Sequence, residues 1–181
     1  MNQVRIAVAG CGLIGREHIA RIVASERALL AATVDPTPEA AEYAKELGCP
    51  HFTDLDGLLE ADLADAVILA TPNHLHAPQA TQLVEAGLTV LVEKPVTHSL
   101  ETAQALVELV AAKQGRVLVG HHRAHSPIMR EAQRIVEEGT LGRLVGIQGS
   151  ATFYKPEHYF EAAPWRTQKG GGPILINLIH E

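Results

Sequence analysis

The sequence predicts an α/β fold, in which a doubly wound parallel sheet is followed by an incomplete α/β domain with an antiparallel sheet. Up to about Gly120, short β-branched runs alternate with longer amphipathic stretches, the pattern of a parallel sheet joined by right-handed helical crossovers. A glycine-rich loop follows the first apolar run. Beyond Gly120 the pattern changes, and the alternating run Leu144–Phe153 indicates an antiparallel strand.

The elements of the first part follow from apolar runs and from residues that begin or end helices. Pro38 suits the first turn of a helix, Gly48 suits a helix end, and Asp54 and Ser99 are expected N-caps. The predicted strands are Val4–Ala9, Leu29–Val34, Ala66–Ala70, Thr89–Val92 and Val117–Gly120. The predicted helices are Ile14–Ser25, Pro38–Leu47, Asp54–Leu59, Ala77–Ala86 and Ser99–Gln114.

We assign residues 1–122 to the first domain and residues 123–181 to a second. A helix is predicted at Ser126–Glu138, and the aromatic stretch Tyr154–Lys169 is expected to be irregular. One long strand and two helix candidates do not complete a two-layer domain. Residues 123–181 are therefore expected to be only the start of a domain: either the chain is truncated, or a partner covers its last third.

The composition is that of a soluble globular protein, with 46% hydrophobic residues and a net charge of −6 over 181 residues. The negative charge and the absence of basic runs argue against nucleic-acid and membrane partners. Cys11 and Cys49 lack metal or redox-motif spacing, which favours a reduced, cytoplasmic setting. The N-terminal apolar run is only as long as a strand, so no signal peptide is expected.

Residues 10–15 read GCGLIG, a G-x-G-x-x-G motif between a predicted strand and a predicted helix. In a Rossmann domain, Gly10 would allow the tight turn, Gly12 the approach of a pyrophosphate, and Gly15 close helix–strand packing. The helix N-terminus would attract the phosphates. The motif therefore predicts a dinucleotide site, and the alternative is a glycine-rich turn without a ligand. Cys11 is expected only to pack.

Asp35 ends the second predicted strand, 35 − 15 = 20 positions after Gly15. An acidic residue there can bind the adenosine ribose 2′-OH and repel a 2′-phosphate. We therefore expect NAD as the cofactor and regard NADP as disfavoured. Asp35 can also be a strand-end turn residue before Pro36, and both interpretations can hold together.

Residues 71–76 (TPNHLH) follow another predicted strand, at the edge where open α/β sheets bind ligands. Thr71, Pro72, Asn73 and His76 are candidate cofactor contacts, although a proline turn before a helix explains the same residues. His74 and His76 resemble metal ligands, but no carboxylate or cysteine converges on them, so no metal is expected.

Glu93-Lys94-Pro95 ends the next predicted strand. Two charges directly after an apolar run are costly to bury without a purpose, so Lys94 could orient a substrate hydroxyl. A loop lysine in solvent is the alternative, and spacing alone favours it.

These motifs, together with Gly170–His180, resemble those of the Gfo/Idh/MocA family of oxidoreductases along the whole chain. The resemblance implies an N-terminal Rossmann domain and a C-terminal α/β domain whose open antiparallel sheet carries the substrate and commonly the oligomer interface. It implies that Lys94 contacts substrate and nicotinamide and that His180 is the general acid/base. A homo-oligomer of the full-length form fits the same resemblance.

The resemblance also implies cofactor contacts from His122 and from Trp165-Arg166 near the nicotinamide end. It favours a domain-junction contact over a metal for the cluster His121, His122 and His125. Many relatives carry Asp where this chain has Ile176, and relatives continue beyond His180. The cofactor-binding candidates are thus Gly10, Gly12, Leu13, Ile14, Gly15, Asp35, Thr71, Pro72, Asn73, His76, Glu93, Lys94, His122, Trp165 and Arg166.

The expected function is hydride transfer between NAD(H) and a secondary alcohol or ketone of a sugar, cyclitol or similar small polyol. The catalytic candidates are Lys94 and His180. Two alternatives remain at this point: a dinucleotide-binding sensor without turnover, and an inactive truncated product.

Overall fold

The computed structural model describes residues 3–97, 99–150, 152, 154–161 and 167. The chain divides into two compact units, Met1–Gly120 and His121–Glu181.

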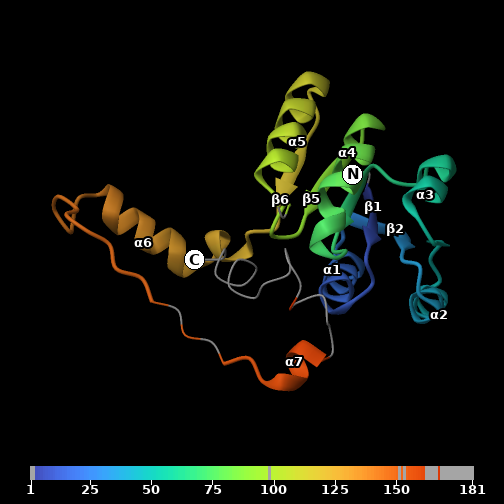
Figure 1. The fold of residues 1–181 in the computed structure, drawn as a ribbon, viewed down its shortest axis with the longest axis horizontal. Coiled ribbons are helices and arrows are strands. Elements are labelled where there is room, and N and C mark those ends of the chain that lie inside the picture. Colours follow the sequence, from blue (N-terminus) through green and yellow to red (C-terminus); the bar gives the residue numbers. More distant parts are fainter. Residues whose placement is uncertain (1–2, 98, 151, 153, 162–166, 168–181) are drawn as a thin grey trace. The chain divides into compact units, whose positions relative to one another are not determined.

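The first unit contains a six-stranded parallel sheet in the order β3-β2-β1-β4-β5-β6. Figure 1 labels β1, β2, β5 and β6 of this sheet. The strand order changes direction at β1, with β2 and β3 on one side of it and β4, β5 and β6 on the other. Open α/β sheets bind ligands at such a switch point. The predicted parallel Rossmann sheet is confirmed. The strands are β1 Val4–Ala9, β2 Ala28–Val34, β3 His51–Phe52, β4 Ala66–Leu69, β5 Thr89–Val92 and β6 Val117–Val119.

Helices cover both faces of this sheet. Helices α1 (Leu13–Val23) and α2 (Pro38–Leu47) pack on one face. Helices α3 (Leu55–Ala61), α4 (Asn73–Glu85) and α5 (Leu100–Lys113) pack on the other. The strand β1 serves both faces, because its buried side chains alternate between the two core clusters.

The predicted helix ends are confirmed where a side chain or a glycine defines them. The Asp54 carboxylate accepts a hydrogen bond from the Gly57 amide, and the Ser99 hydroxyl accepts one from the Thr102 amide. Gly48 ends α2 in the left-handed conformation, with φ of 66°.

The predicted start of α4 at Ala77 is wrong, because the helix begins at Asn73 and carries Pro78 inside it. A helix that began at Ala77 would have Pro78 in its first turn, where the missing N–H costs nothing. As a result, Asn73 and His76 lie on a helix rather than in a loop.

The second unit contains a 3-10 turn, η1 (His122–His125), and the helices α6 (Pro127–Glu137) and α7 (Glu157–Glu161). Ser126 caps α6 as predicted, accepting a hydrogen bond from the Met129 amide. The helix α7 falls in the stretch that was expected to be irregular.

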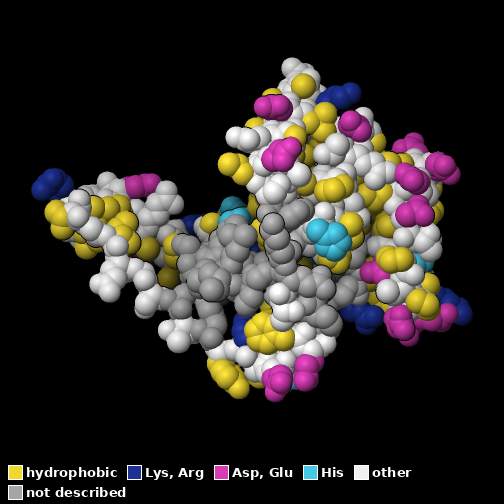
Figure 2. Space-filling model, viewed as in Figure 1, with side chains coloured by type: hydrophobic (Ala, Val, Ile, Leu, Met, Phe, Trp, Pro, Cys, Tyr) yellow, Lys and Arg dark blue, Asp and Glu magenta, His cyan; other side chains and the backbone are white. Residues whose placement is uncertain are grey.

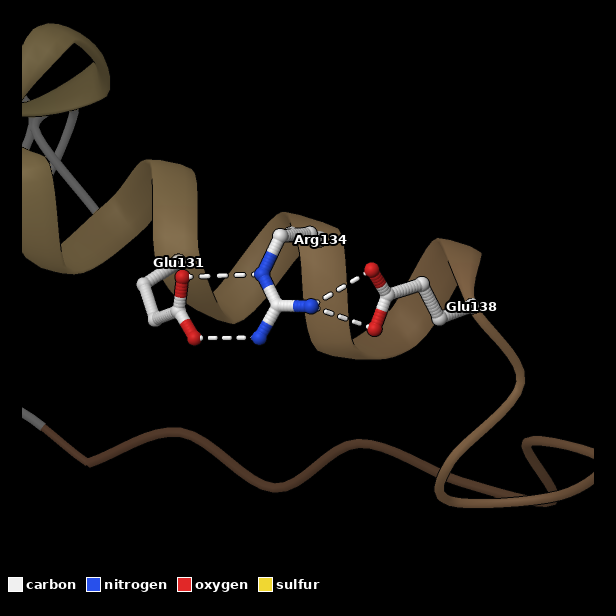
Figure 3. Close-up of polar contacts among 3 residues, drawn as sticks. All are labelled: Glu131, Arg134 and Glu138. Carbon is white, nitrogen blue, oxygen red and sulfur yellow. Dashed lines mark hydrogen bonds and ion pairs between the residues drawn. The ribbon is translucent and has the colours of Figure 1, made fainter.

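Helix α6 carries a surface ion-pair network centred on Arg134 (Figure 3). Its guanidinium donates hydrogen bonds to the carboxylates of Glu131 and Glu138, one turn away on either side. The pairs follow the i,i+3 and i,i+4 spacing of a helix. They stabilise the helix locally and form no binding site.

The predicted antiparallel strand Leu144–Phe153 is wrong for the residues described, because 144–150 and 152 have no regular secondary structure. A strand needs a neighbour to satisfy its backbone groups, and the described part of the second unit offers none. The apolar side chains of this run are therefore exposed, Val145 to 87% and Ile147 to 89%.

The face drawn in Figure 2 shows several Asp and Glu side chains and no single patch of Lys and Arg. Within the described residues, no helix has the length and apolar character needed to cross a membrane.

Candidate functional site

The glycine-rich loop packs so closely that two of its positions exclude any side chain. A Cβ on Gly10, which has φ of +87°, would lie 2.6 Å from the Ala70 carbonyl group. A Cβ on Gly15 would lie 1.8 Å from the Gly10 carbonyl oxygen. A Cβ on Gly12, by contrast, would meet no atom within 4 Å. The loop thus lies against the end of β4 and leaves open space at its middle glycine.

The N-terminus of α1 opens toward this space. Gly12 is the N-cap and offers no side chain, and the described first turn of α1 contains no acidic residue. Leu13 and Ile14 begin the helix with exposed side chains. The free N–H groups and partial positive charge of such a helix start favour an anion.

The Asp35 carboxylate is bonded to the same loop. Its Oδ2 accepts a hydrogen bond from the Cys11 amide at 2.8 Å, and its Oδ1 accepts from the Thr37 amide at 2.9 Å and the Thr37 hydroxyl at 2.6 Å. Burial opposes ionisation, but the hydrogen bonds from Thr37 and Cys11 outweigh it, so the pKa of Asp35 lies below its usual value. Asp35 is therefore a fixed negative charge at neutral pH.

A cavity of about 500 Å³ extends from the glycine loop past Asp35. It lies at the carboxyl ends of β1, β2 and β4, with Gly10, Thr71 and Pro72 in its wall. Two further carboxylates, those of Asp54 and Asp56, also line it. An acidic wall of this kind disfavours an additional phosphate at this end of the site.

Asn73 is buried with an unsatisfied donor at the start of α4. Its side chain is 7% exposed, and its Nδ2 has no hydrogen-bond partner among the described residues. Buried amide groups are normally paired. Asn73 follows Pro72, which lines the cavity, so this orphaned donor lies next in sequence to the cavity wall and fits a polar ligand at this edge of the sheet.

His76 joins the two strand-end loops of this edge. The ring is 1% exposed, with Nε2 2.8 Å from the Thr71 carbonyl oxygen and Nδ1 2.7 Å from the Pro95 carbonyl oxygen. The structure therefore shows a residue that holds backbone in place, whereas direct cofactor contact by His76 stays a prediction.

We expect His76→Leu to destabilise the protein by roughly 2 kcal/mol, because leucine has no N–H to replace the ring donor and a buried carbonyl group loses its hydrogen bond. The matched control is His74→Leu, because His74 lies two positions earlier on α4 and is exposed. This variant should change stability by less than about 0.5 kcal/mol. Urea denaturation measures both. Equal stabilities for the two variants would contradict this account of His76.

Glu93 and Lys94 follow β5, and Glu93 is paired with a residue that the sequence analysis missed. His18, on α1, has its Nε2 2.9 Å from Oε1 of Glu93. The Lys94 amide donates to Oε2 of the same carboxylate at 3.3 Å. Burial alone would raise the pKa of Glu93, but the His18 hydrogen bond and the neighbouring positive charges lower it overall.

The remaining candidates divide by where they lie. His122 belongs to η1 of the second unit, and Trp165, Arg166, Ile176 and His180 lie outside the described residues. Cys11 is buried in the core as predicted; burial, and to a lesser degree the Asp35 charge, raise the pKa of its thiol to about 11. Among the described residues, no three His, Cys, Asp or Glu side chains converge as metal ligands would.

Comparison with known families matches both parts of the chain. A family model described as the oxidoreductase family with an NAD-binding Rossmann fold matches residues 4–121. A second model, the GFO/IDH/MocA C-terminal domain, matches residues 129–181.

Known proteins show the same similarity. The scyllo-inositol 2-dehydrogenase (NAD(+)) of Bacillus subtilis is 35% identical over 99% of this chain and 52% of its own length. The WlbA dehydrogenase of Chromobacterium violaceum, solved with NADH and UDP-GlcNAcA, is 26% identical, with a TM-score of 0.88 over 99% of this chain and 53% of that one.

A third relative is the scyllo-inositol dehydrogenase of Lactobacillus casei, solved with NAD(H) and scyllo-inositol. It is 26% identical, with a TM-score of 0.74 over 78% of this chain and 43% of that one. The chain spans about half the length of the curated relatives it matches.

Proposed function

The chain belongs to the Gfo/Idh/MocA family of oxidoreductases, and from this premise we propose that it transfers a hydride between NAD(H) and a secondary alcohol or ketone of a sugar, cyclitol or similar small polyol. The observation that carries the proposal is the placement of Glu93-Lys94-Pro95 directly after β5, in the same sheet whose switch point carries the glycine loop. A binding site for a dinucleotide and a charged amine thus share one sheet edge. The relatives named above, two of them solved with NAD(H) or NADH, support the same class of reaction.

The dinucleotide would be held by the groups around the glycine loop. The α1 N-terminus would bind its pyrophosphate, and Asp35 would accept a hydrogen bond from the adenosine ribose. The acidic wall around Asp35 favours NAD over NADP. The bound nicotinamide supplies the hydride acceptor or donor.

The chemical roles proposed for the protein are proton transfer and charge stabilisation. The Lys94 ammonium would bind the substrate oxygen and stabilise negative charge that develops on it. His180 would take the hydroxyl proton during oxidation and return it during reduction. Its role rests on the family resemblance of the Gly170–His180 segment. Residues 129–181 would form the start of the substrate domain.

The proposal is tested by incubating the purified protein with NAD+ and a panel containing myo-inositol, scyllo-inositol and D-glucose. We expect at least one polyol to produce NADH, measured by its absorbance, and we expect His180→Ala to remove this activity. Tight NADH binding without turnover on any panel member would contradict the proposal and favour a dinucleotide sensor. The family resemblance implies Asp at the position of Ile176, and this difference motivates that alternative.

A further inference from the structure

We propose that His18 and Glu93 form a positioning pair that holds Lys94 in place relative to the glycine loop. The inference rests on the proposed function, because it assigns a role to two residues around its catalytic lysine. Neither residue is proposed to touch the substrate. The pair acts through Lys94.

The pair connects two elements that are distant in sequence. His18 lies on α1, three positions after Gly15, and Glu93 follows β5, 75 positions further along the chain. The two side chains are 22% and 16% exposed, so water screens their contact only partly. This contact holds α1, which follows the glycine loop, against the segment after β5 that contains Lys94.

The charge states of the pair follow from the chemistry of its groups. Glu93 is ionised at neutral pH because its pKa lies below the usual value, burial being outweighed by the His18 hydrogen bond and the nearby positive charges. An ionised carboxylate only accepts hydrogen bonds. The Nε2 atom of His18 must therefore carry the proton that is shared with Oε1.

The carboxylate is also held on its other sides. The Lys94 amide donates to Oε2, and the Lys94 ammonium is one of the charges that lower the pKa of Glu93. Glu93 thus connects the backbone of Lys94 to His18 through its two carboxylate oxygens. A rotation of the Glu93 side chain would break both hydrogen bonds.

Gly120 provides the space that the carboxylate occupies. A Cβ on Gly120 would lie 2.8 Å from Oε1 and 3.0 Å from Cδ of Glu93. The Gly120 amide donates to the Val92 carbonyl, so the backbone of β6 is anchored beside β5 and cannot easily retreat. A methyl group here would displace the end of the Glu93 side chain, which is flexible, rather than backbone.

The test follows the Lys94 amine in the protein itself. Reductive methylation with a ¹³C label makes each lysine side chain visible by NMR, and Lys94→Met identifies the Lys94 signal. We expect His18→Leu, Glu93→Gln and Gly120→Ala each to shift the titration of that signal. His18→Gln, which keeps a donor, should restore much of the wild-type titration. The control is Arg21→Leu, which removes an exposed side chain from the same helix and should shift nothing.

Kinetics adds a second readout once a polyol substrate is identified. The three disruptive variants should lower kcat roughly 100-fold through misplacement of Lys94, while the NADH Kd changes less than about threefold. His18→Leu and Glu93→Gln should not be additive, since both break one contact. An unchanged Lys94 titration in His18→Leu would overturn the proposal. If the variants shift the Lys94 titration as expected but the wild-type protein turns over no polyol, the proposed function is overturned and the His18–Glu93 pair is established.

Discussion

Gly15→Ala is expected to abolish NADH binding and to destabilise the protein, whereas Gly12→Ala should abolish binding alone. The Gly15 methyl would lie 1.8 Å from the Gly10 carbonyl oxygen, a distance that no packed structure tolerates. Because that neighbour is backbone, the whole loop must move away from α1. Overpacking of this kind costs about 3 kcal/mol, and the displaced loop no longer presents its amides to a pyrophosphate.

Gly12→Ala is the matched control for the same chemical change. Its methyl group meets no protein atom within 4 Å, so the free energy of unfolding should fall by no more than about 1 kcal/mol, the cost of alanine at the N-cap. The methyl occupies the open space proposed for the pyrophosphate, so we expect the NADH Kd to rise roughly 100-fold. Urea denaturation and NADH fluorescence measure the two effects separately. A Gly12→Ala variant that binds NADH normally would show that the phosphates lie elsewhere.

Lys94→Met is expected to reduce kcat roughly 1,000-fold while the fold is retained. Methionine has a similar length and lacks the ammonium group, so the substrate oxygen loses the charge that stabilises it during hydride transfer. Lys94 is half-buried, and the backbone amide of the variant still donates to Glu93. The NADH Kd should change only a few-fold.

Steady-state kinetics with a polyol from the panel that the wild-type protein oxidises measures this loss. Lys113→Met, on an exposed position of α5, controls for the removal of a positive charge and should retain normal turnover. A near-normal kcat for Lys94→Met would contradict a catalytic role for this lysine.

Local patterns predicted most of the first unit. The bounds of β1 and α2 were predicted to the residue, because an apolar run between turn residues and a Pro-to-Gly helix are complete signals in themselves. The strand β3 was missed because two residues, His51 and Phe52, are too few to show an alternation. The Leu144–Phe153 strand failed for another reason: alternation predicts a strand only where a neighbouring strand is available.

The part of the candidate site that depends on local sequence spacing was also predictable. The glycine loop and Asp35 follow from spacing along the chain, and the structure adds the hydrogen bond that joins Asp35 to Cys11. The His18–Glu93 contact could not be predicted, since nothing in the sequence pairs residues 75 positions apart. The sequence contained only a weak indication that His18 belongs to the site: it lies about one turn beyond Gly15, on the helix that would bind the phosphates.

The most direct test of the central claim is a fluorescence titration of the purified 181-residue chain with NADH and with NADPH. The account predicts saturable NADH binding and NADPH binding at least roughly tenfold weaker, because Asp35 is a fixed negative charge where a 2′-phosphate would lie. A folded protein that binds neither nucleotide would contradict the assignment of the glycine loop. Equal or tighter binding of NADPH would contradict the role assigned to Asp35.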